Sequence, residues 1–121
     1  DTDNNFNSGL DFVFKNLKRI SFVCASHNED SIFKVMEMMK TYKLNTNDNN
    51  IWFGQLYGMS DNISFNLASN NYNTFKILPF GSVKNLMPYL IRRAEENTSV
   101  QGQTGRELQL ILKERKRRSL L

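Results

Sequence analysis

The spacing of apolar positions changes early in the chain. In SGLDFVFKNLKR, apolar side chains recur at the i, i+3, i+4 and i+7 positions of one helical face, at Leu10, Val13, Phe14 and Leu17. The next segment, ISFVCAS at residues 20–26, is a short run of β-branched and aromatic residues with almost no polar interruption. Such a run is typical of a strand covered on both faces, as in a parallel sheet. The pattern therefore predicts a helix followed by a buried strand.

The alternation of helical and strand-like patterns continues to the carboxyl end. Residues 28–44 carry a helical pattern that begins with Asn28, a suitable N-cap, and two acidic residues that complement the helix dipole. Apolar runs at residues 51–58 and 73–81 predict two further strands, the latter stopped by a proline and a glycine. The other predicted helices cover residues 61–71, residues 83–97, with Ser82 as cap and Pro88 inside, and residues 105–118.

Three strands that alternate with helices indicate an α/β fold with parallel strands joined by right-handed crossovers. A small three-layer domain is one interpretation. A chain that begins with a helix and offers only three strands looks more like part of a larger α/β fold. The edges of the first and third strands then require a partner segment or self-association.

The charge of the chain is concentrated at one end. The chain has 121 residues, 40% of them hydrophobic, and a net charge of +4. Residues 106–121 contain six basic and two acidic side chains, so the remainder is neutral overall. This indicates a basic tail rather than a basic binding surface. We interpret the tail as a solvated helix end, with binding to an anionic membrane surface or to nucleic acid as the alternative.

Several kinds of site and segment are missing from the sequence. No apolar run approaches the roughly 20 residues that cross a bilayer, and no signal-peptide pattern is present. The chain starts at Asp1 without an initiator Met, so we expect a processed or excised piece. A single His and a single Cys cannot form a zinc site by themselves, and no metal is predicted. No glycine-rich phosphate loop is present, and Cys24 between apolar neighbours is predicted to be a small core residue.

Polar residues cluster where the predicted strands end. Ligands of parallel α/β folds bind at the carboxyl ends of the strands. The sequence SHN at residues 26–28 follows the first strand, and QLY at residues 55–57 ends the second. Each set also has a purely structural interpretation. Asn28 can cap a helix, His27 can be half-buried with a backbone partner, and Gln55 can belong to a strand that ends in a glycine turn.

The segment PYLIRRAEEN carries two adjacent arginines, Arg92 and Arg93, in an amphipathic helix. Tyr89 lies three and four residues before them and Glu96 lies four and three residues after them, so one patch can hold all four side chains. Such a ladder is commonly a set of surface ion pairs. Near a strand-end pocket, two guanidinium groups are instead well suited to bind a carboxylate or phosphate through paired hydrogen bonds.

Four motifs in order resemble the carboxyl-terminal part of proline dehydrogenase, in its eukaryotic mitochondrial form: CASHNEDSI, FGQLYGMSDNISF, KILPFG and PYLIRRAEEN. The resemblance implies a distorted (βα)₈ barrel that holds FAD, of which this chain would supply a helix and strands six to eight with their helices. Such a barrel needs about 250 residues, roughly twice this length. We therefore expect residues 1–105 to be the last part of the barrel and residues 106–121 to be a basic helix or tail.

The resemblance implies a role for five residues at the substrate. Arg92 and Arg93 match paired arginines that hold the substrate carboxylate, and Tyr89 matches an aromatic wall of the pocket. Leu56 matches an apolar residue over the substrate. Ile77 departs from the family, which usually has a Tyr at this position, two residues before a proline. Related hydroxyproline enzymes have a smaller residue there, so Ile77 leaves the choice between proline and hydroxyproline open.

The resemblance implies a role for five further residues at the cofactor. Ser26 and His27, with Asn28 beside them, match residues that contact FAD at the end of the sixth strand. Gln55 is expected near the flavin, although bacterial members carry their glutamine one position earlier. Glu96 matches an acid that forms a hydrogen bond within the flavin site and supports the arginines.

The implied reaction is oxidation of L-proline to pyrroline-5-carboxylate, with FAD as hydride acceptor and a membrane quinone as electron acceptor. Because the family's other pocket residues belong to earlier strands, we expect this chain to be inactive without the missing amino-terminal half. The resemblance also implies a mitochondrial location on the matrix side of the inner membrane, with peripheral membrane association as an open alternative. No nucleic-acid partner is expected. Competing hypotheses are hydroxyproline as substrate and a non-catalytic module that binds an acidic partner through its basic end.

Overall fold

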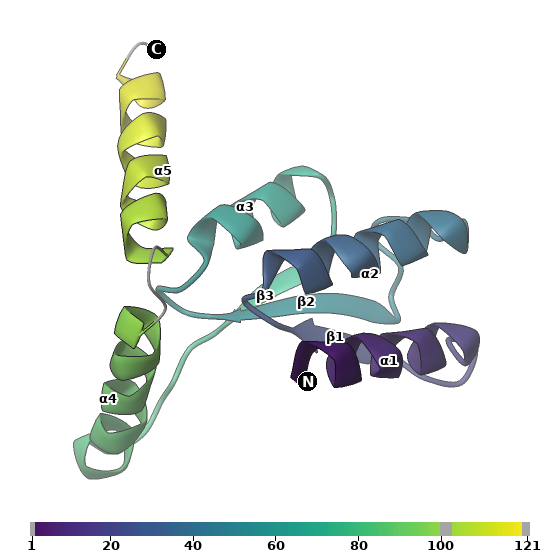
Figure 1. Cartoon of the computed structure of the whole chain (residues 1–121), viewed down its shortest axis with the longest axis horizontal. Coiled ribbons are helices and arrows are strands. Elements are labelled where there is room, and N and C mark those ends of the chain that lie inside the picture. The colour runs from purple at the N-terminus through teal and green to yellow at the C-terminus, as the bar shows by residue number, and fades with distance from the viewer. Residues whose placement is uncertain (1, 100–102, 120–121) are drawn as a thin grey trace. The chain divides into compact units, whose positions relative to one another are not determined.

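The computed structural model describes the backbone of residues 2–99 and 103–119 and the side chains of residues 4–95 and 108–119. It contains two compact units, Asp1–Ile77 and Leu78–Leu121, which we describe separately (Figure 1). The elements of the first unit are α1 (Thr2–Lys15), β1 (Phe22–Ala25), α2 (Glu29–Thr41), β2 (Ile51–Leu56), α3 (Asp61–Ser69) and β3 (Thr74–Ile77). The elements of the second unit are α4 (Val83–Ser99) and α5 (Gln103–Arg118). The predicted alternation of helices and strands is confirmed, and the strands are shorter than predicted.

The three strands of the first unit form one parallel sheet in the order β1-β2-β3. The pairing runs from Phe22 opposite Ile51 to Ala25 opposite Gly54, and on the other side of β2 it ends with Leu56 opposite Ile77. Because the strands are parallel, all three carboxyl ends lie at the same edge of the sheet. The loops that follow β1 and β2 therefore begin at a common edge.

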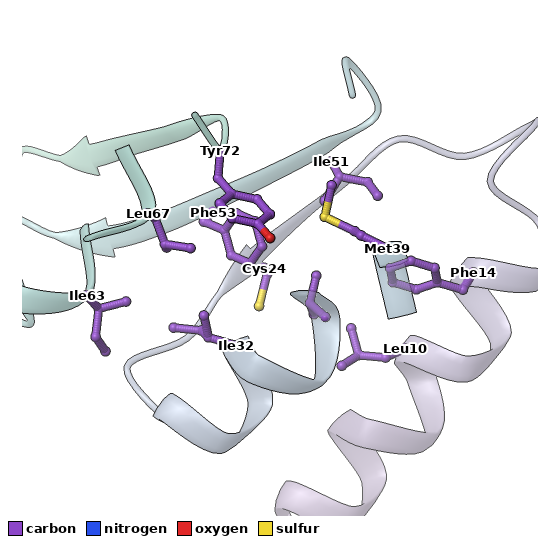
Figure 2. Packing of buried hydrophobic residues seen from close by; sticks show 11 residues of the cluster. Leu10, Phe14, Cys24, Ile32, Met39, Ile51, Phe53, Ile63, Leu67 and Tyr72 are labelled. Carbon is purple, nitrogen blue, oxygen red and sulfur yellow. The ribbon is translucent and has the colours of Figure 1, made fainter. Parts of the chain in front are cut away.

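One face of the sheet packs against helices. Cys24, Ile51 and Phe53 point to this face and are completely buried. Figure 2 shows these residues in contact range of apolar side chains from the helices. The buried cluster also contains Leu10 and Phe14 from α1, Ile32, Val35 and Met39 from α2, Ile63 and Leu67 from α3, and Tyr72. The ring of Phe53 meets that of Tyr72 edge to face, with centroids 5.6 Å apart. We call this side of the sheet the helix face.

The other side of the sheet, which we call the open face, is apolar and largely exposed in the described chain. Its residues alternate with those of the helix face: Val23, Ala25, Trp52, Gly54, Leu56, Phe75 and Ile77. Val23 is 47% exposed and Ile77 is 40% exposed. The expectation that the first strand is covered on both faces is wrong for this chain. An apolar run shows that both faces avoid water, but it does not show that both coverings come from the same chain.

The ring of Phe75 lies over Gly54 on the open face. A Cβ atom at Gly54 would lie 2.9 Å from Cζ of Phe75 and 3.2 Å from Cγ1 of Val23. The indole of Trp52 lies beside the Phe75 ring, with centroids 6.3 Å apart and ring planes tilted by 58°. Because Gly54 has no side chain, the Phe75 ring can pack directly against the backbone of β2.

The second unit consists of two helices with exposed apolar stripes. Helix α4 begins directly after Ser82, as predicted, and the carbonyl oxygen of Ser82 accepts hydrogen bonds from the backbone of Asn85 and Leu86, both at 3.0 Å. The exposed apolar residues of α4 have helical spacing and are Val83, Met87, Leu90 and Ile91. Those of α5 are Leu108, Ile111 and Leu112. No helix in the described residues is long and apolar enough to cross a membrane.

Candidate functional site

The turn after β1 is held by two short-range hydrogen bonds on either side of His27. The backbone N–H of Asn28 donates to Oγ of Ser26 at 3.1 Å. Oδ1 of Asn28 in turn accepts from the backbone N–H of Asp30 at 3.0 Å and caps α2. The predicted capping role of Asn28 is confirmed. The two bonds fix the path of the backbone at the strand edge, with the half-buried imidazole of His27 between them.

The imidazole of His27 meets the loop that follows β2. Nδ1 of His27 lies 2.8 Å from Oγ of Ser60, a residue 33 positions away in sequence. Ser60 has φ 51° and ψ 43°, a left-handed conformation that is uncommon for a residue with a side chain. The structure therefore joins the loops after β1 and β2 through a side-chain contact that sequence spacing does not reveal.

Gln55 points to the helix face and is 1% exposed. Its Oε1 accepts from Oγ of Ser64 at 2.9 Å, and its Nε2 lies 3.4 Å from the carbonyl oxygen of Ser26. Both ends of the amide are therefore engaged within the protein. Contact of Gln55 with a cofactor stays a prediction, and its position instead offers support for the backbone of Ser26.

Leu56 and Ile77 lie next to each other at the carboxyl ends of β2 and β3. They are partners in the strand pairing, and both belong to the open face. The backbone N–H of Tyr57 donates to the carbonyl oxygen of Ile77 at 2.9 Å, which extends the pairing past the strand ends. The structure thus brings together the two apolar residues that the sequence singled out. It separates them from Gln55 by the thickness of the sheet.

Tyr89 and Arg93 are in contact on α4. The guanidinium carbon of Arg93 lies 5.3 Å from the centroid of the Tyr89 ring, within the range of a cation–π interaction. Arg92 is exposed and Arg93 is half-buried. The side chain of Glu96 lies outside the described residues, so its predicted place beside the arginines stays a prediction. The contact of Tyr89 with Arg93 is the i, i+4 pairing expected on one face of a helix.

Four residues of this region were missed in the sequence: Ser60, Asp61, Ser64 and Lys76. Nζ of Lys76 donates to the carbonyl oxygen of Met59 at 2.6 Å and lies 2.7 Å from Oδ1 of Asp61. A signal for Lys76 was present, since it is a charged residue between Phe75 and Ile77 in a short strand, and alternation places it on the helix face. No comparable signal marks Ser60.

The remaining candidates for reactivity and metal binding lie in the core or do not cluster. Burial raises the pKa of the Cys24 thiol to about 12, so this group is protonated and unreactive at neutral pH. The predicted core role of Cys24 is confirmed. Among the described side chains, those of residues 4–95 and 108–119, no group of three His, Cys, Asp or Glu could hold a metal ion.

The parallel sheet, with polar and apolar candidate site residues at its carboxyl edge, indicates the class of protein: an α/β fold of the barrel type. The proline dehydrogenase family model matches residues 1–106. The solved structure of proline utilization A (PutA) from Bdellovibrio bacteriovorus inactivated by N-propargylglycine superimposes with a TM-score of 0.74 and 28% sequence identity. The match covers 82% of this chain and 10% of that chain, and it confirms the predicted fold class. The chain belongs to the proline dehydrogenase family.

Two curated relatives show how much of such a protein the chain represents. The chain is 44% identical over 123 residues to proline dehydrogenase 1, mitochondrial, of Dictyostelium discoideum, which covers 98% of this chain and 22% of that protein. It is 40% identical over 109 residues to hydroxyproline dehydrogenase of Xenopus laevis, which covers 90% of this chain and 23% of that protein. The chain thus spans about a fifth of the length of these relatives.

Proposed function

We propose that the chain is the carboxyl-terminal part of a flavoenzyme that oxidises L-proline to pyrroline-5-carboxylate. The observation that carries the proposal is the placement of Leu56 and Ile77 side by side on the open face, at the carboxyl ends of two parallel strands. In a (βα)₈ barrel the helices lie outside, and side chains at the carboxyl ends of the strands border the substrate pocket. The open face of this sheet then corresponds to the barrel interior. The named activities of the relatives support this assignment.

The missing part of the barrel explains the exposed apolar surface of the described chain. Trp52, Phe75 and Ile77 of the open face would be covered by the strands that complete the barrel. The apolar stripe of α4 would be covered in the same way, since barrel helices pack against the strands. We therefore propose that this chain alone is inactive and requires the amino-terminal half. The predicted division into residues 1–105, the last part of the barrel, and residues 106–121, a basic helix or tail, is part of this proposal.

We assign the substrate carboxylate to Arg92 and Arg93. Two adjacent guanidinium groups can bind a carboxylate through paired, charge-assisted hydrogen bonds. The cation–π contact with Tyr89 restricts the rotamers of Arg93 before substrate arrives. Guanidinium groups remain charged and do not accept the proton of the imino acid. Their contribution is to orient the substrate, and tight orientation can lower a barrier by several kcal/mol.

Ser26, His27 and Asn28 are the residues that would hold FAD. They supply a hydroxyl, an imidazole and an amide at the start of α2, and the side chains of all three are half-buried at the carboxyl edge of the sheet. Polar groups beside a helix N-terminus suit the phosphates and polar ring edges of such a cofactor. When bound, the flavin would supply the hydride-accepting chemistry. We propose that Gln55 supports Ser26 from the helix face and that Glu96 supports the arginines.

Hydroxyproline is the second candidate substrate, and Ile77 is the observation that favours it. Ile77 lies beside Leu56 on the open face and is 40% exposed there, so it would contact the substrate ring. The relatives do not separate the alternatives, because hydroxyproline dehydrogenases of Xenopus laevis and Bos taurus are 40% and 43% identical to this chain. Turnover of the two imino acids by one preparation decides between them.

The cellular setting follows the named relatives. Proline dehydrogenase 1 of Dictyostelium discoideum, Bos taurus and Homo sapiens is described as mitochondrial, and we propose the same location for this protein, on the matrix side of the inner membrane. A quinone would be the final electron acceptor. Association with the membrane surface would place the enzyme near that acceptor.

The function is tested by combining the chain with the amino-terminal part of the Dictyostelium discoideum relative. The assembly is expected to reduce a dye with L-proline. Replacing Arg93 by Lys keeps the charge but removes the paired hydrogen bonds, and it should raise KM for L-proline at least about 10-fold, the equivalent of about one charge-assisted hydrogen bond. The matched control is Arg115→Lys in α5, which should leave KM unchanged. An assembly with flavin bound and with equal KM for the Arg93→Lys variant and its control would refute the carboxylate assignment.

A further inference from the structure

Ser60 contacts His27 instead of capping the helix that it precedes. Ser60 stands at the N-cap position of α3, where a serine side chain ordinarily accepts a hydrogen bond from the first turn of the helix. Here the side chain makes no capping bond. Its hydroxyl instead lies 2.8 Å from Nδ1 of His27. Its backbone carbonyl oxygen accepts hydrogen bonds from the N–H groups of Ile63 and Ser64. The hydroxyl is thus diverted from its local role to a residue 33 positions earlier.

The backbone of Ser60 is held from both sides by one lysine. Nζ of Lys76 donates to the carbonyl oxygen of Met59 at 2.6 Å and pairs with Oδ1 of Asp61 at 2.7 Å. Met59 and Asp61 flank Ser60, whose left-handed backbone (φ 51°) is an unfavourable conformation for serine. Strained conformations persist where surrounding contacts over-determine them, and Lys76 supplies two such contacts to the neighbours of Ser60.

The same assembly also supports the backbone beside His27. Oγ of Ser64 donates to Oε1 of Gln55 at 2.9 Å and lies 3.2 Å from the carbonyl oxygen of Ser60. Nε2 of Gln55 lies 3.4 Å from the carbonyl oxygen of Ser26. A continuous set of polar contacts therefore connects the residue before His27 with the residue that meets its ring.

We propose that Ser60, held by Lys76, is a positioning residue for His27 and selects the tautomer of its imidazole. Within the described residues the hydroxyl of Ser60 has Nδ1 of His27 as its one hydrogen-bond partner. In the proposed arrangement the hydroxyl donates its proton to Nδ1. Nδ1 is then the acceptor, and the imidazole carries its proton on Nε2. In this form Nε2 is the donor nitrogen of the ring.

The composition of the chain makes this proposal directly measurable. His27 is the only histidine, so the ring nitrogens of an isotope-labelled chain give NMR signals that need no assignment to a residue. At a pH where the imidazole is neutral, the 121-residue chain is expected to show an unprotonated Nδ1 and a protonated Nε2. A protonated Nδ1 would overturn the proposal.

The decisive variant is Ser60→Gly. Glycine adopts the left-handed backbone without strain, so the variant removes the hydroxyl while the fold is kept. The ratio of the tautomer protonated on Nε2 to the tautomer protonated on Nδ1 should fall roughly 2- to 12-fold, the equilibrium equivalent of one ordinary hydrogen bond. Asn71→Gly is the matched control, because Asn71 also has a left-handed backbone (φ 61°) and should leave the ratio unchanged. An unchanged ratio in Ser60→Gly would refute the role of the hydroxyl.

Lys76→Met tests the second half of the proposal. It should lower the same tautomer ratio. Lys34→Met is the matched control and should leave the ratio unchanged. Lys34 likewise donates to a carbonyl oxygen, that of Asn7 at 3.1 Å, and pairs with Asp11. Equal tautomer ratios in Lys76→Met and the wild type would contradict the role assigned to Lys76 and leave Ser60 alone as the positioning residue.

The link to the cofactor rests on the proposed function and is tested separately. In the assembly with the amino-terminal half, Ser60→Gly should lower the FAD retained after gel filtration, and Asn71→Gly should not. If the wild-type assembly retains no FAD while the tautomer depends on Ser60, the proposed function fails and the positioning of His27 stands. If the wild type retains FAD and Ser60→Gly retains as much, the cofactor role of this contact is refuted.

Discussion

The two faces of the same three-stranded sheet differ in what the chain itself supplies. On the helix face, Cys24, Ile51 and Phe53 are completely buried by helices of this chain. On the open face, the alternate residues of the same strands are apolar but exposed, among them Val23, Trp52 and Phe75. The chain thus contains a packed core on one side of the sheet. On the other side it has an apolar surface that the described residues of the chain leave largely exposed. Leu56 and Ile77, which are proposed to border the substrate, belong to the incomplete side.

The largest expected effect separates the two faces by stability. Phe53→Ala on the helix face should lower the free energy of unfolding by about 3–5 kcal/mol, since it empties a fully buried site. Phe75→Ala on the open face is the matched change, and with the ring already 38% exposed it should cost about 1 kcal/mol or less. Urea denaturation of the isolated chain gives both values. Equal losses would mean that the open face is covered in solution.

An intermediate effect is expected for the buried polar residue of the helix face. Gln55→Ala removes the acceptor of the Ser64 hydroxyl and the donor near the Ser26 carbonyl, so it should cost about 1–3 kcal/mol. Its neighbour Leu56 faces the other side, and Leu56→Ala should change stability little but raise KM for L-proline about 10-fold in the assembly. Denaturation and steady-state kinetics on both variants measure the contrast. A reversed pattern would mean that the two faces are assigned the wrong way round.

A smaller effect is expected where Phe75 crosses Gly54. Gly54→Ala places a Cβ atom 2.9 Å from the end of the Phe75 ring, which can swing outward on the open face. We expect a loss of about 1 kcal/mol. In a Phe75→Leu background the loss should disappear. Gly9→Ala, which meets no atom within 4 Å, should instead stabilise α1 by up to about 1 kcal/mol. A full loss at Gly54 in the Phe75→Leu background would contradict the role of the ring.

The smallest effect lies outside both faces, in α5. Hydrogen bonds from Arg117 and then from Arg118 lower the pKa of Glu114 to about 2. A carboxyl group with a depressed pKa in the folded helix stabilises it above the ordinary pKa and loses this contribution as pH falls toward 2. The helical circular dichroism of a peptide of residues 103–119 should decrease slightly over this range. Glu114→Gln should remove that part of the pH dependence. An identical profile for the variant would show that solvent screens these pairs completely.

The order of elements could be predicted from sequence because it depends on local patterns. The spacing of Leu10, Val13 and Phe14 predicted the first helix, although Leu17 lies beyond its end at Lys15. The position of Asn28 after an apolar run predicted its capping role. The coverage of the open face could not be predicted. Its apolar residues have the same chemistry whether the covering strands belong to this chain or to another segment.

The candidate site could be predicted only in part, for a similar reason. The strand-end positions of Leu56 and Ile77 follow from chain order, and the structure makes them neighbours. The contact of Ser60 with His27 bridges 33 positions and depends on a left-handed residue, which neither periodicity nor composition encodes. The Tyr89 and Arg93 contact was accessible because it follows helical spacing within one element.

We propose that the open face completes a flavin-dependent site for proline. The most direct measurement is the visible spectrum of the chain assembled with the amino-terminal part of the Dictyostelium discoideum relative, recorded without oxygen before and after addition of L-proline. We expect a flavin absorption band in the assembly, none in the isolated chain, and bleaching of the band by L-proline. An assembly that forms but shows no flavin band, or a band that L-proline leaves unchanged, would contradict it.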